Sequence, residues 1–465
     1  MIRKLTGSIL FVVVFGYVVA RAVLLSFTHD ESLSFAIVEG NTFFRDTANN
    51  HLLNTLLMGW SKKLFGTSEF ALRLPNVLAF IIYFSSLAAI VKIAKAGSLS
   101  LLALIMGLSS PFLIEFFSLA RGYGLSLAFF VLSLVYLLRN NFTYHSHLTY
   151  GKDYFFCLLF GVLSMFSNLS MINYVIMLVL LFTLKLVFVI VQRNAEARRC
   201  IYIFVTITLL SVIPFYIALK QLLFLKEKEE LYFGADSLVE LVNSVIAPTH
   251  GYRGSAISVL IICCLVFIMA GIAAVIYKKA YKSSLSILIL LIVGLAVGFW
   301  LENLVFSAKY PHGRGALFLL VLFALYAIFF ISPIFESPAV SNKIKMVFVF
   351  CVGAVLTLNF LSSANLHYTT TWRYDAHTKD AMKIIETTTK NAVQRYTISN
   401  DWLLEPAINY YIRARGLKLA PADRGGVRSD SHFIYKLNME PSPDFTLLKS
   451  YDDIQSSLWI HNRLP

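Results

Sequence analysis

The chain has 465 residues, of which 58% are hydrophobic and only 14% are charged, and its mean hydropathy is +0.71. Because ordinary globular domains carry about 25% charged residues, this composition excludes a soluble globular protein and predicts a polytopic membrane protein. We attribute the formal net charge of +14 mainly to cytoplasmic loops, with attraction to anionic lipid heads or phosphates as the alternative. A nucleic-acid partner is not expected, because no aromatic-basic recognition motif stands out.

Eleven apolar runs approach the length of about 20 residues that a membrane-spanning helix needs. They cover residues 7–27, 76–94, 99–117, 122–138, 154–169, 171–191, 200–219, 256–277, 284–304, 315–333 and 344–362. Only Ser167, Asn168 and Ser170 separate the fifth run from the sixth, and we interpret the two runs as separate helices.

The basic residues set the orientation of these runs. With the N-terminus inside, every inner connection carries at least two Lys or Arg residues. The short outer turns carry only Arg121 in one case and Lys309 with Arg314 in another. This asymmetry follows the positive-inside rule and supports the division of residues 154–191. We therefore predict a multi-pass protein of the cell inner membrane.

Three long regions then lie outside the cytoplasm, at residues 28–75, 220–255 and 363–465. Within the first, the run 52–60 has the pattern of an amphipathic helix lying along the membrane interface. The second opens with the charged stretch 226–230.

The polar tail has a pattern of its own. Residues 396–399 and 433–437 are typical of strands, and a helix is expected from Glu405 to Arg415, ended by Gly416. The predicted fold class is thus an all-α polytopic membrane protein of about 11 transmembrane helices, residues 1–362, with a small extracytoplasmic α/β domain at residues 363–465.

Two adjacent acids, Asp30 and Glu31, follow the first apolar run and should lie at the outer membrane interface. The functional interpretation is a general base, in which one carboxylate takes a proton from an acceptor hydroxyl while the other orients it or binds a metal. The alternative is a solvated acid pair beside a helix end.

Further polar residues follow in the same outer region. The segment 50–54 holds His51 and Asn54, and a longer string leads into the second apolar run. Its marked positions are Gly66, Ser68, Glu69, Arg73 and Pro75. This arrangement resembles the first loop of GT-C glycosyltransferases, the family that contains protein O-mannosyltransferases and the aminoarabinose transferases that modify lipid A. Where many relatives have prolines after the histidine, this chain has Leu52 and Leu53.

The resemblance implies a GT-C-like fold, with Asp30 and Glu31 as catalytic acids and with His51, Asn54 and Tyr123 in the substrate pocket. It also places a donor-facing arginine at Arg121, where a guanidinium can grip a phosphate bidentately. Gly122 and Gly124 would let a ligand approach closely.

A late outer turn, residues 309–314, is implied to bind the leaving phosphate of the donor. Its candidate side chains are Lys309, Tyr310, His312 and Arg314. Snorkelling toward lipid headgroups is the alternative for these residues and for Arg121. Glu302 is a buried-acid candidate that would pair with Lys309 or Arg314.

The tail opens with the motif 372–377, which we interpret as docking onto the outer loops, with acceptor binding as the alternative. None of the five cysteines has CxxC spacing, and no His/Cys/Asp spacing amounts to a metal motif. No metal ligand is therefore predicted, and a divalent cation stays open as a cofactor.

The sequence as a whole predicts a hexosyl or pentosyl transferase that inverts the anomeric centre. The donor would be a sugar on polyprenyl phosphate, and the acceptor a glycan, lipid or protein on the extracytoplasmic face, with membrane lipids as further partners. A transporter or flippase for a lipid-linked or anionic substrate is the rival class, although few ionisable residues fall mid-helix. A receptor or assembly scaffold would explain the large tail but not the outer acid pair.

Overall fold

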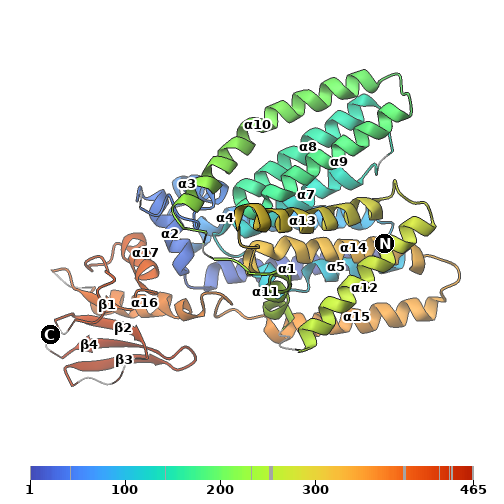
Figure 1. The fold of residues 1–465 in the computed structure, drawn as a ribbon. Helices are drawn as coiled ribbons and strands as arrows, with labels where there is room; N and C mark the ends of the chain where they lie inside the picture. The colour runs from blue at the N-terminus through green and yellow to red at the C-terminus, as the bar shows by residue number, and fades with distance from the viewer. Residues whose placement is uncertain are drawn as a thin grey trace.

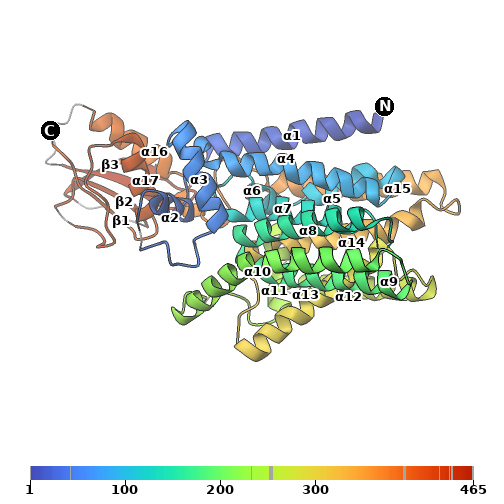
Figure 2. The same ribbon diagram turned by 90° about the horizontal axis from the view of Figure 1, so that it is seen from above.

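The computed structural model describes residues 2–462 except 42, 142, 232, 251–254, 391–393, 429, 439 and 441–442. A long bundle of helices forms most of the molecule, and a smaller unit with a β-sheet lies at one end of it (Figures 1 and 2). The short helices of the first outer region lie between the two.

Each of the eleven predicted apolar runs is helical in the structure, and the third is divided into two short helices. The helices are α1 (Ile2–Leu24), α4 (Glu69–Ile93), α5 (Ser100–Leu108) with α6 (Pro111–Glu115), α7 (Gly122–Leu138), α8 (His147–Ser167), α9 (Ile172–Val191), α10 (Ala197–Glu227), α12 (Ser255–Tyr277), α13 (Ser284–Phe306), α14 (Leu317–Phe335) and α15 (Asn342–Ser363). Seven helices of the described residues have the length and hydropathy to cross a membrane on their own. The chain is a multi-pass, mainly helical membrane protein.

The predicted division within residues 154–191 is confirmed. Helix α8 ends at Ser167, and the following Asn168 leaves the helical conformation, with φ −154° and ψ 109°. The side chain of Asn168 then accepts a hydrogen bond from the backbone N–H of Ser170, which opens a 3₁₀ turn before α9. An asparagine side chain that competes for backbone N–H groups favours such a break.

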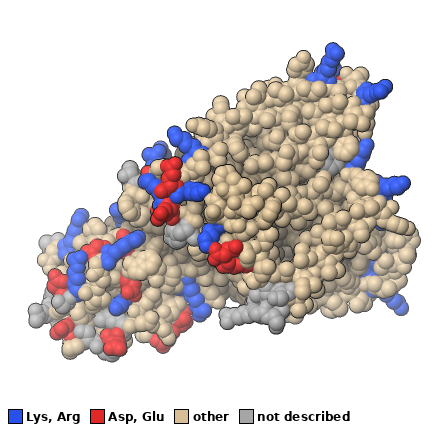
Figure 3. All heavy atoms as spheres, viewed as in Figure 1, with Lys and Arg blue, Asp and Glu red and all other residues tan. Residues whose placement is uncertain are grey.

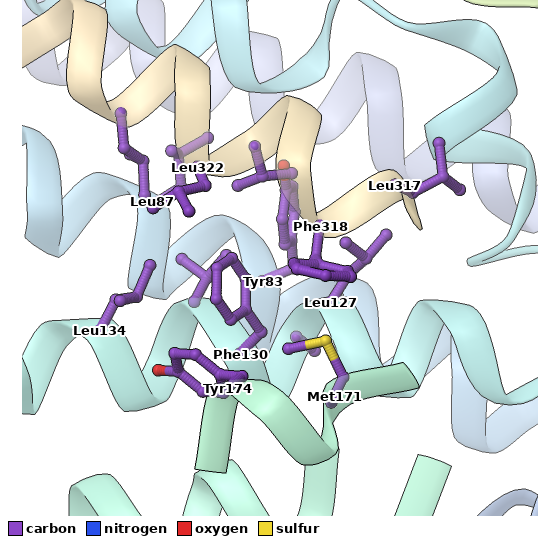
Figure 4. Close-up of a cluster of buried hydrophobic side chains, with 14 of the residues drawn as sticks. Tyr83, Leu87, Leu127, Phe130, Leu134, Met171, Tyr174, Leu317, Phe318 and Leu322 are labelled. Carbon is purple, nitrogen blue, oxygen red and sulfur yellow. The ribbon is translucent and has the colours of Figure 1, made fainter. Parts of the chain in front are cut away.

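The core of the bundle lies between α4, α7, α9 and α14. Figure 4 shows Tyr83, Phe130, Tyr174 and Phe318 packed together there. The hydroxyl of Tyr83 donates to the carbonyl of Gly107 at 2.7 Å, and that of Tyr174 donates to Ser133 at 2.8 Å. These bonds satisfy the two buried phenols, whose burial would otherwise cost free energy.

Charge is unevenly distributed over the face in Figure 3. Both signs cover the tail unit, an uncharged band follows over the bundle, and mostly Lys and Arg edge its far end. An uncharged band of this kind is what a bilayer requires. A basic far end agrees with the predicted orientation, in which that end faces the cytoplasm.

The first outer region folds into two short helices, α2 (His29–Val38) and α3 (Leu52–Phe65). Helix α3 was predicted in part, from the apolar run 52–60, whereas α2 was not predicted. Thr28 begins α2 with a capping box, in which its side chain accepts from the N–H of Glu31 while the Glu31 carboxylate accepts from the N–H of Thr28. The box therefore fixes the start of the helix that carries both acids.

The second outer region contains α11 (Leu238–His250). Before it, Ala235 pairs with Tyr310 through two backbone hydrogen bonds of 2.9 Å. This bridge ties the second outer region to the late turn 309–314, which continues as the 3₁₀ segment Gly313–Ala316.

The tail forms a four-stranded sheet with helices beside it. Its elements are the 3₁₀ segment Arg373–Asp375, α16 (Thr378–Thr388), β1 (Ile398–Asn400), α17 (Glu405–Arg415), β2 (Phe433–Leu437), β3 (Phe445–Tyr451) and β4 (Ser456–His461). The strand order is β1-β2-β4-β3, with β1 parallel to β2 and the other pairs antiparallel. The predicted α17 and β2 are confirmed at both ends, and β1 overlaps its prediction.

The tail unit shares a hydrophobic core with the first outer region. Phe27, Phe35, Met58 and Leu72 pack in one cluster with tail residues such as Tyr411. The backbone N–H of Phe27 donates to the Tyr411 hydroxyl at 2.8 Å. The predicted boundary at residue 363 therefore divides the chain by composition, while the packing joins the tail to α2 and α3.

Candidate active site

One cavity of about 1810 Å³ opens where α2, the tail and the late outer turn meet. Its polar part is lined by Asp30, Asn49, His51, Tyr123 and Arg314. Its apolar part runs between α9, α10 and α13. The lining there includes Leu180, Leu184, Leu219, Leu222, Val293 and Val297. A cavity that joins polar groups to a long apolar groove suits a ligand with a polar head and a lipid chain.

Asp30 lies at the centre of the polar part and is only 5% exposed. One carboxylate oxygen, Oδ2, lies 3.0 Å from Arg314 Nη2 and 3.3 Å from Arg121 Nη2. Burial by itself would raise the pKa of Asp30, but these two guanidinium groups outweigh it and lower the pKa below its usual range. Asp30 is therefore ionised at neutral pH.

Glu31, its neighbour, points into the protein and is completely buried. Arg73 grips both of its oxygens, at 2.8 Å and 2.7 Å. The backbone N–H groups of Thr28 and Ala120 donate to the same two oxygens. Glu31 does not line the cavity. The catalytic or metal-binding role predicted for it would require these bonds to open, so the geometry makes it a positioning residue.

The string that carried the sequence resemblance holds this ion pair in place. Ser68 begins α4 by accepting from the N–H of Ala71 at 3.3 Å. One turn later Arg73 reaches Glu31, and its remaining donors bond the carbonyls of Ala22, Leu25 and Ser26. The string therefore acts as scaffold for the acids.

Arg121 is also fully buried, behind Asp30. It donates to the carbonyl and side-chain oxygens of Asn49, to the Asp30 carbonyl and to Ser34, over 3.0–3.1 Å. It is not among the cavity-lining residues. Its predicted contact with the donor phosphate would therefore need the Arg121 side chain to move into the cavity. In this structure Arg121 instead pairs with the Asp30 carboxylate from the buried side.

The two glycines after Arg121 make room for protein rather than for a ligand. A Cβ on Gly122 would lie 2.0 Å from the Ser167 carbonyl oxygen and 2.8 Å from the His51 side chain. A Cβ on Gly124 would lie 2.5 Å from the Phe116 carbonyl oxygen. These glycines let the helices approach each other closely.

Arg314, unlike Arg121, lines the cavity. Its Nε donates to the Tyr123 hydroxyl at 3.0 Å, and its Nη2 contacts Asp30. The guanidinium carbon lies 4.7 Å from the centre of the Trp372 ring, a cation–π contact. These contacts orient the guanidinium while part of its side chain, 20%, stays exposed.

The other members of the late turn lie farther along the same cavity. Lys309, Tyr310 and His312 all line it. Lys309 forms an exposed ion pair with Asp236. Glu302 bonds Asn173 of α9 at 2.8 Å. The prediction that Glu302 pairs with Lys309 or Arg314 is wrong, because the amide of Asn173 is the partner that faces it.

His51 and Asn54 lie at different depths. His51 lines the cavity and meets the Tyr123 ring edge-on, at 4.6 Å between ring centres. Burial and the charges of Arg121 and Arg314 hold the pKa of His51 well below its usual range, so the imidazole is neutral. Asn54 lies behind it and bonds Ala120 and Asn76, outside the cavity lining.

The tail contributes residues of the motif 372–377, for which acceptor binding was the alternative interpretation, and Trp402, which the sequence analysis did not single out. Trp372 is 3% exposed and contacts both Arg314 and Asp30. Asp375 accepts from the backbone N–H of His29 at 2.6 Å. Tyr374 and Trp402 line the cavity. The predicted docking of the motif 372–377 is confirmed by these contacts, and the docking itself completes the site.

Metal binding has no support from side-chain clustering. Among the described residues, no group of three His, Cys, Asp or Glu side chains could hold a metal ion.

Comparison with solved structures identifies proteins that share this fold. No protein-family model matches the sequence, and no curated protein matches it. Among solved structures, ArnT from Cupriavidus metallidurans in the apo state is similar over 97% of both chains, with 12% identity and a TM-score of 0.54. The same enzyme bound to undecaprenyl phosphate is similar over 97% of both chains, with 13% identity and a TM-score of 0.50. The chain therefore has the fold of the GT-C membrane glycosyltransferases.

Proposed function

We propose that the protein is a membrane glycosyltransferase that moves a sugar from a polyprenyl-phosphate carrier to an acceptor hydroxyl or phosphate on the extracytoplasmic face, with inversion. The observation that carries this proposal is the Asp30–Arg314 pair, which lies at the polar head of a cavity with a long apolar groove. The GT-C fold supports the same reaction class.

The apolar groove suits the polyprenyl chain. Leu180, Leu184, Leu219 and Val297 give it an aliphatic wall on three helices. An isoprenoid chain buried there gains about 25 cal/mol per Å² of apolar surface removed from water, although a chain taken from the bilayer gains less. ArnT was crystallised with undecaprenyl phosphate, a carrier of the class proposed for this chain.

The carrier phosphate would lie against Arg314, with Lys309 and His312 beyond it. The acceptor oxygen attacks the anomeric carbon from the side opposite the phosphate. The new C–O bond forms as the C–O bond to the phosphate breaks, and the acceptor proton passes to Asp30. Polyprenyl phosphate leaves with its charge stabilised by the guanidinium, which acts where the negative charge develops.

Asp30 in its ion pairs is a weak base, because two arginines lower its pKa. A bound phosphate would compete for Arg314, since that residue faces the cavity while Arg121 is held by Asn49 and Ser34. Loss of one guanidinium contact raises the basicity of Asp30 when the donor is in place.

The test is an assay of the purified protein with radiolabelled sugars on undecaprenyl phosphate, added to lipid vesicles with extracts of surface glycans. We expect release of undecaprenyl phosphate together with transfer of label. A transporter would move the lipid between leaflets without breaking the glycosyl bond. Intact donor after incubation with every sugar in the panel would contradict the proposal.

A further inference from the structure

The wall of the cavity on the tail side has a composition unlike that of the rest. It consists of His29, Tyr374, Trp402, Leu403 and Arg424. None of these residues contacts Arg314 or the late turn by a hydrogen bond or ion pair among the described residues. Trp402 is 56% exposed.

The ring of Trp402 is held by its neighbours. The next residue, Leu403, uses its carbonyl to accept from His29 Nδ1 at 2.7 Å. The His29 ring then meets the Trp402 ring edge-on, at 6.1 Å and 88°. An indole that is buttressed in this way presents a flat apolar face with a polar N–H, which suits the C–H face of a sugar ring.

His29 adds a hydrogen-bond acceptor beside this ring. Because the Leu403 carbonyl can only accept, Nδ1 carries the proton, and in the neutral imidazole Nε2 keeps its lone pair. His29 lines the cavity next to Asp30 along the chain. A sugar hydroxyl bonded to Nε2 would therefore lie in the same cavity as the proposed base.

Arg424 supplies a positive charge at the same wall. Its Nε donates to Glu405 at 3.3 Å, and its guanidinium carbon lies 6.0 Å from the centre of the Trp402 ring. The bond to Glu405 uses Nε, so Nη1 and Nη2 are available to an anion in the part of the chain that the structure describes. Half of the side chain, 48%, is exposed.

We propose that this wall is the acceptor subsite, and that it takes a carbohydrate bearing a phosphate or carboxylate group. The sugar stacks on Trp402, a hydroxyl bonds His29, and the acidic group pairs with Arg424. The assignment rests on the proposed function, which gives the lipid groove to the donor. The wall is built on α2 and the tail, whereas the lipid groove is built on α9, α10 and α13, so the two substrates are assigned to different parts of the lining of the same cavity.

The size of the cavity allows both substrates to bind together. Pockets for single small ligands measure about 300–1,000 Å³, whereas this cavity measures about 1810 Å³. Part of this volume is the apolar groove assigned to the lipid chain, and the polar part is lined by both the late turn and the tail wall.

The test is binding of glucose, glucose 6-phosphate and glucuronate to the purified full-length chain, measured by saturation-transfer NMR. Affinity for undecaprenyl phosphate is measured in parallel. We expect the two acidic sugars to bind about tenfold more tightly than glucose, since one charge-assisted contact is worth roughly that much. Trp402→Ala should weaken all three about tenfold, and Arg424→Gln should remove only the preference for the acidic sugars.

Two matched controls should change neither pattern. Trp60→Ala removes an indole that is also 56% exposed but lies outside the cavity lining. Arg428→Gln removes an exposed tail arginine that pairs with Asp423 and is likewise outside the lining. Undecaprenyl phosphate should bind all four variants as it binds the unmodified chain.

Three results would overturn the subsite. The first is that no sugar binds, and the second is that Trp402→Ala binds the sugars as tightly as the unmodified chain does. The third is that Arg424→Gln keeps the same preference for acidic sugars over glucose as the unmodified chain. Complete displacement of the sugars by undecaprenyl-phosphate glucose would also overturn it, by assigning the wall to the donor sugar. Failure of undecaprenyl phosphate to bind would instead contradict the proposed function and leave the sugar measurements intact.

Discussion

The two neighbouring acids of α2 occupy opposite environments. Each is paired with an arginine, yet Glu31 is sealed inside the protein with Arg73, whereas Asp30 meets Arg314 at the wall of the cavity. The sealed pair has every oxygen bonded by residues distant in sequence. The open pair keeps one partner that can exchange with a ligand. Glu31 thus helps to build the site, and the residue before it in the chain, Asp30, faces the cavity.

The largest effect that this contrast predicts is on catalysis. Asp30→Asn keeps the shape of the side chain but removes the proposed base, so turnover should fall by about 10²–10⁴-fold, the usual worth of general-base catalysis. The unfolding temperature should fall as well, because Arg121 is fully buried and loses the countercharge of Asp30, so turnover is compared well below the unfolding temperature of the variant. Asp453→Asn, at an exposed tail acid paired with His377, is the matched control. Turnover near that of the unmodified chain in Asp30→Asn would remove Asp30 as the base.

The next effect is on stability, at the sealed pair. Glu31→Gln leaves Arg73 as a buried charge without a countercharge, which costs about 3–5 kcal/mol in other proteins. We expect a clear fall in unfolding temperature, with activity lost in parallel as the protein unfolds. The double variant Glu31→Gln with Arg73→Gln should lose less than the sum of the single variants, because it removes the unpaired charge. Additive losses would show that the two residues act independently.

Donor affinity should respond more weakly. Arg314→Gln removes the guanidinium that lines the cavity beside Asp30, so affinity for undecaprenyl phosphate should fall about tenfold, as for one charge-assisted contact. Lys309→Gln should cost only a few-fold, because Lys309 is exposed and already paired with Asp236. A larger loss from Lys309→Gln than from Arg314→Gln would move the phosphate site outward along the late turn.

The sequence predicted the helices better than it predicted the division of labour among the acids. The length of the apolar runs predicts the membrane-spanning helices directly. The break between α8 and α9 at Asn168 depends only on neighbouring residues, so it could be predicted as well. The adjacency of Asp30 and Glu31 made the two look equivalent. Their difference comes from which way each points on α2, and α2 has no apolar periodicity by which to recognise it.

The tail wall of the site could not be predicted for a related reason. Trp372 lies more than 340 positions from Asp30 in the sequence, and its contact depends on how the tail packs on Phe27 and Phe35. The aromatic motif 372–377 was the only signal, and it indicated docking. A single sequence carries no information on which cavity a docked segment completes.

The smallest effect is a shift in the pH dependence of turnover. It tests whether the ion pair between Asp30 and Arg314 separates when the donor binds. In the free enzyme the pKa of Asp30 is lowered, so its carboxylate persists as pH falls and is lost only below the usual range of about 3.9. The acid limb of kcat/KM, which reports the free enzyme, should therefore lie below about pH 4. If the donor phosphate draws Arg314 away, the pKa of Asp30 rises in the complex, and the acid limb of kcat should lie at higher pH. If the acid limbs of kcat and kcat/KM lie at the same pH, Arg314 stays paired with Asp30 throughout turnover. Asp30 would then be as permanently paired with its arginine as Glu31 is.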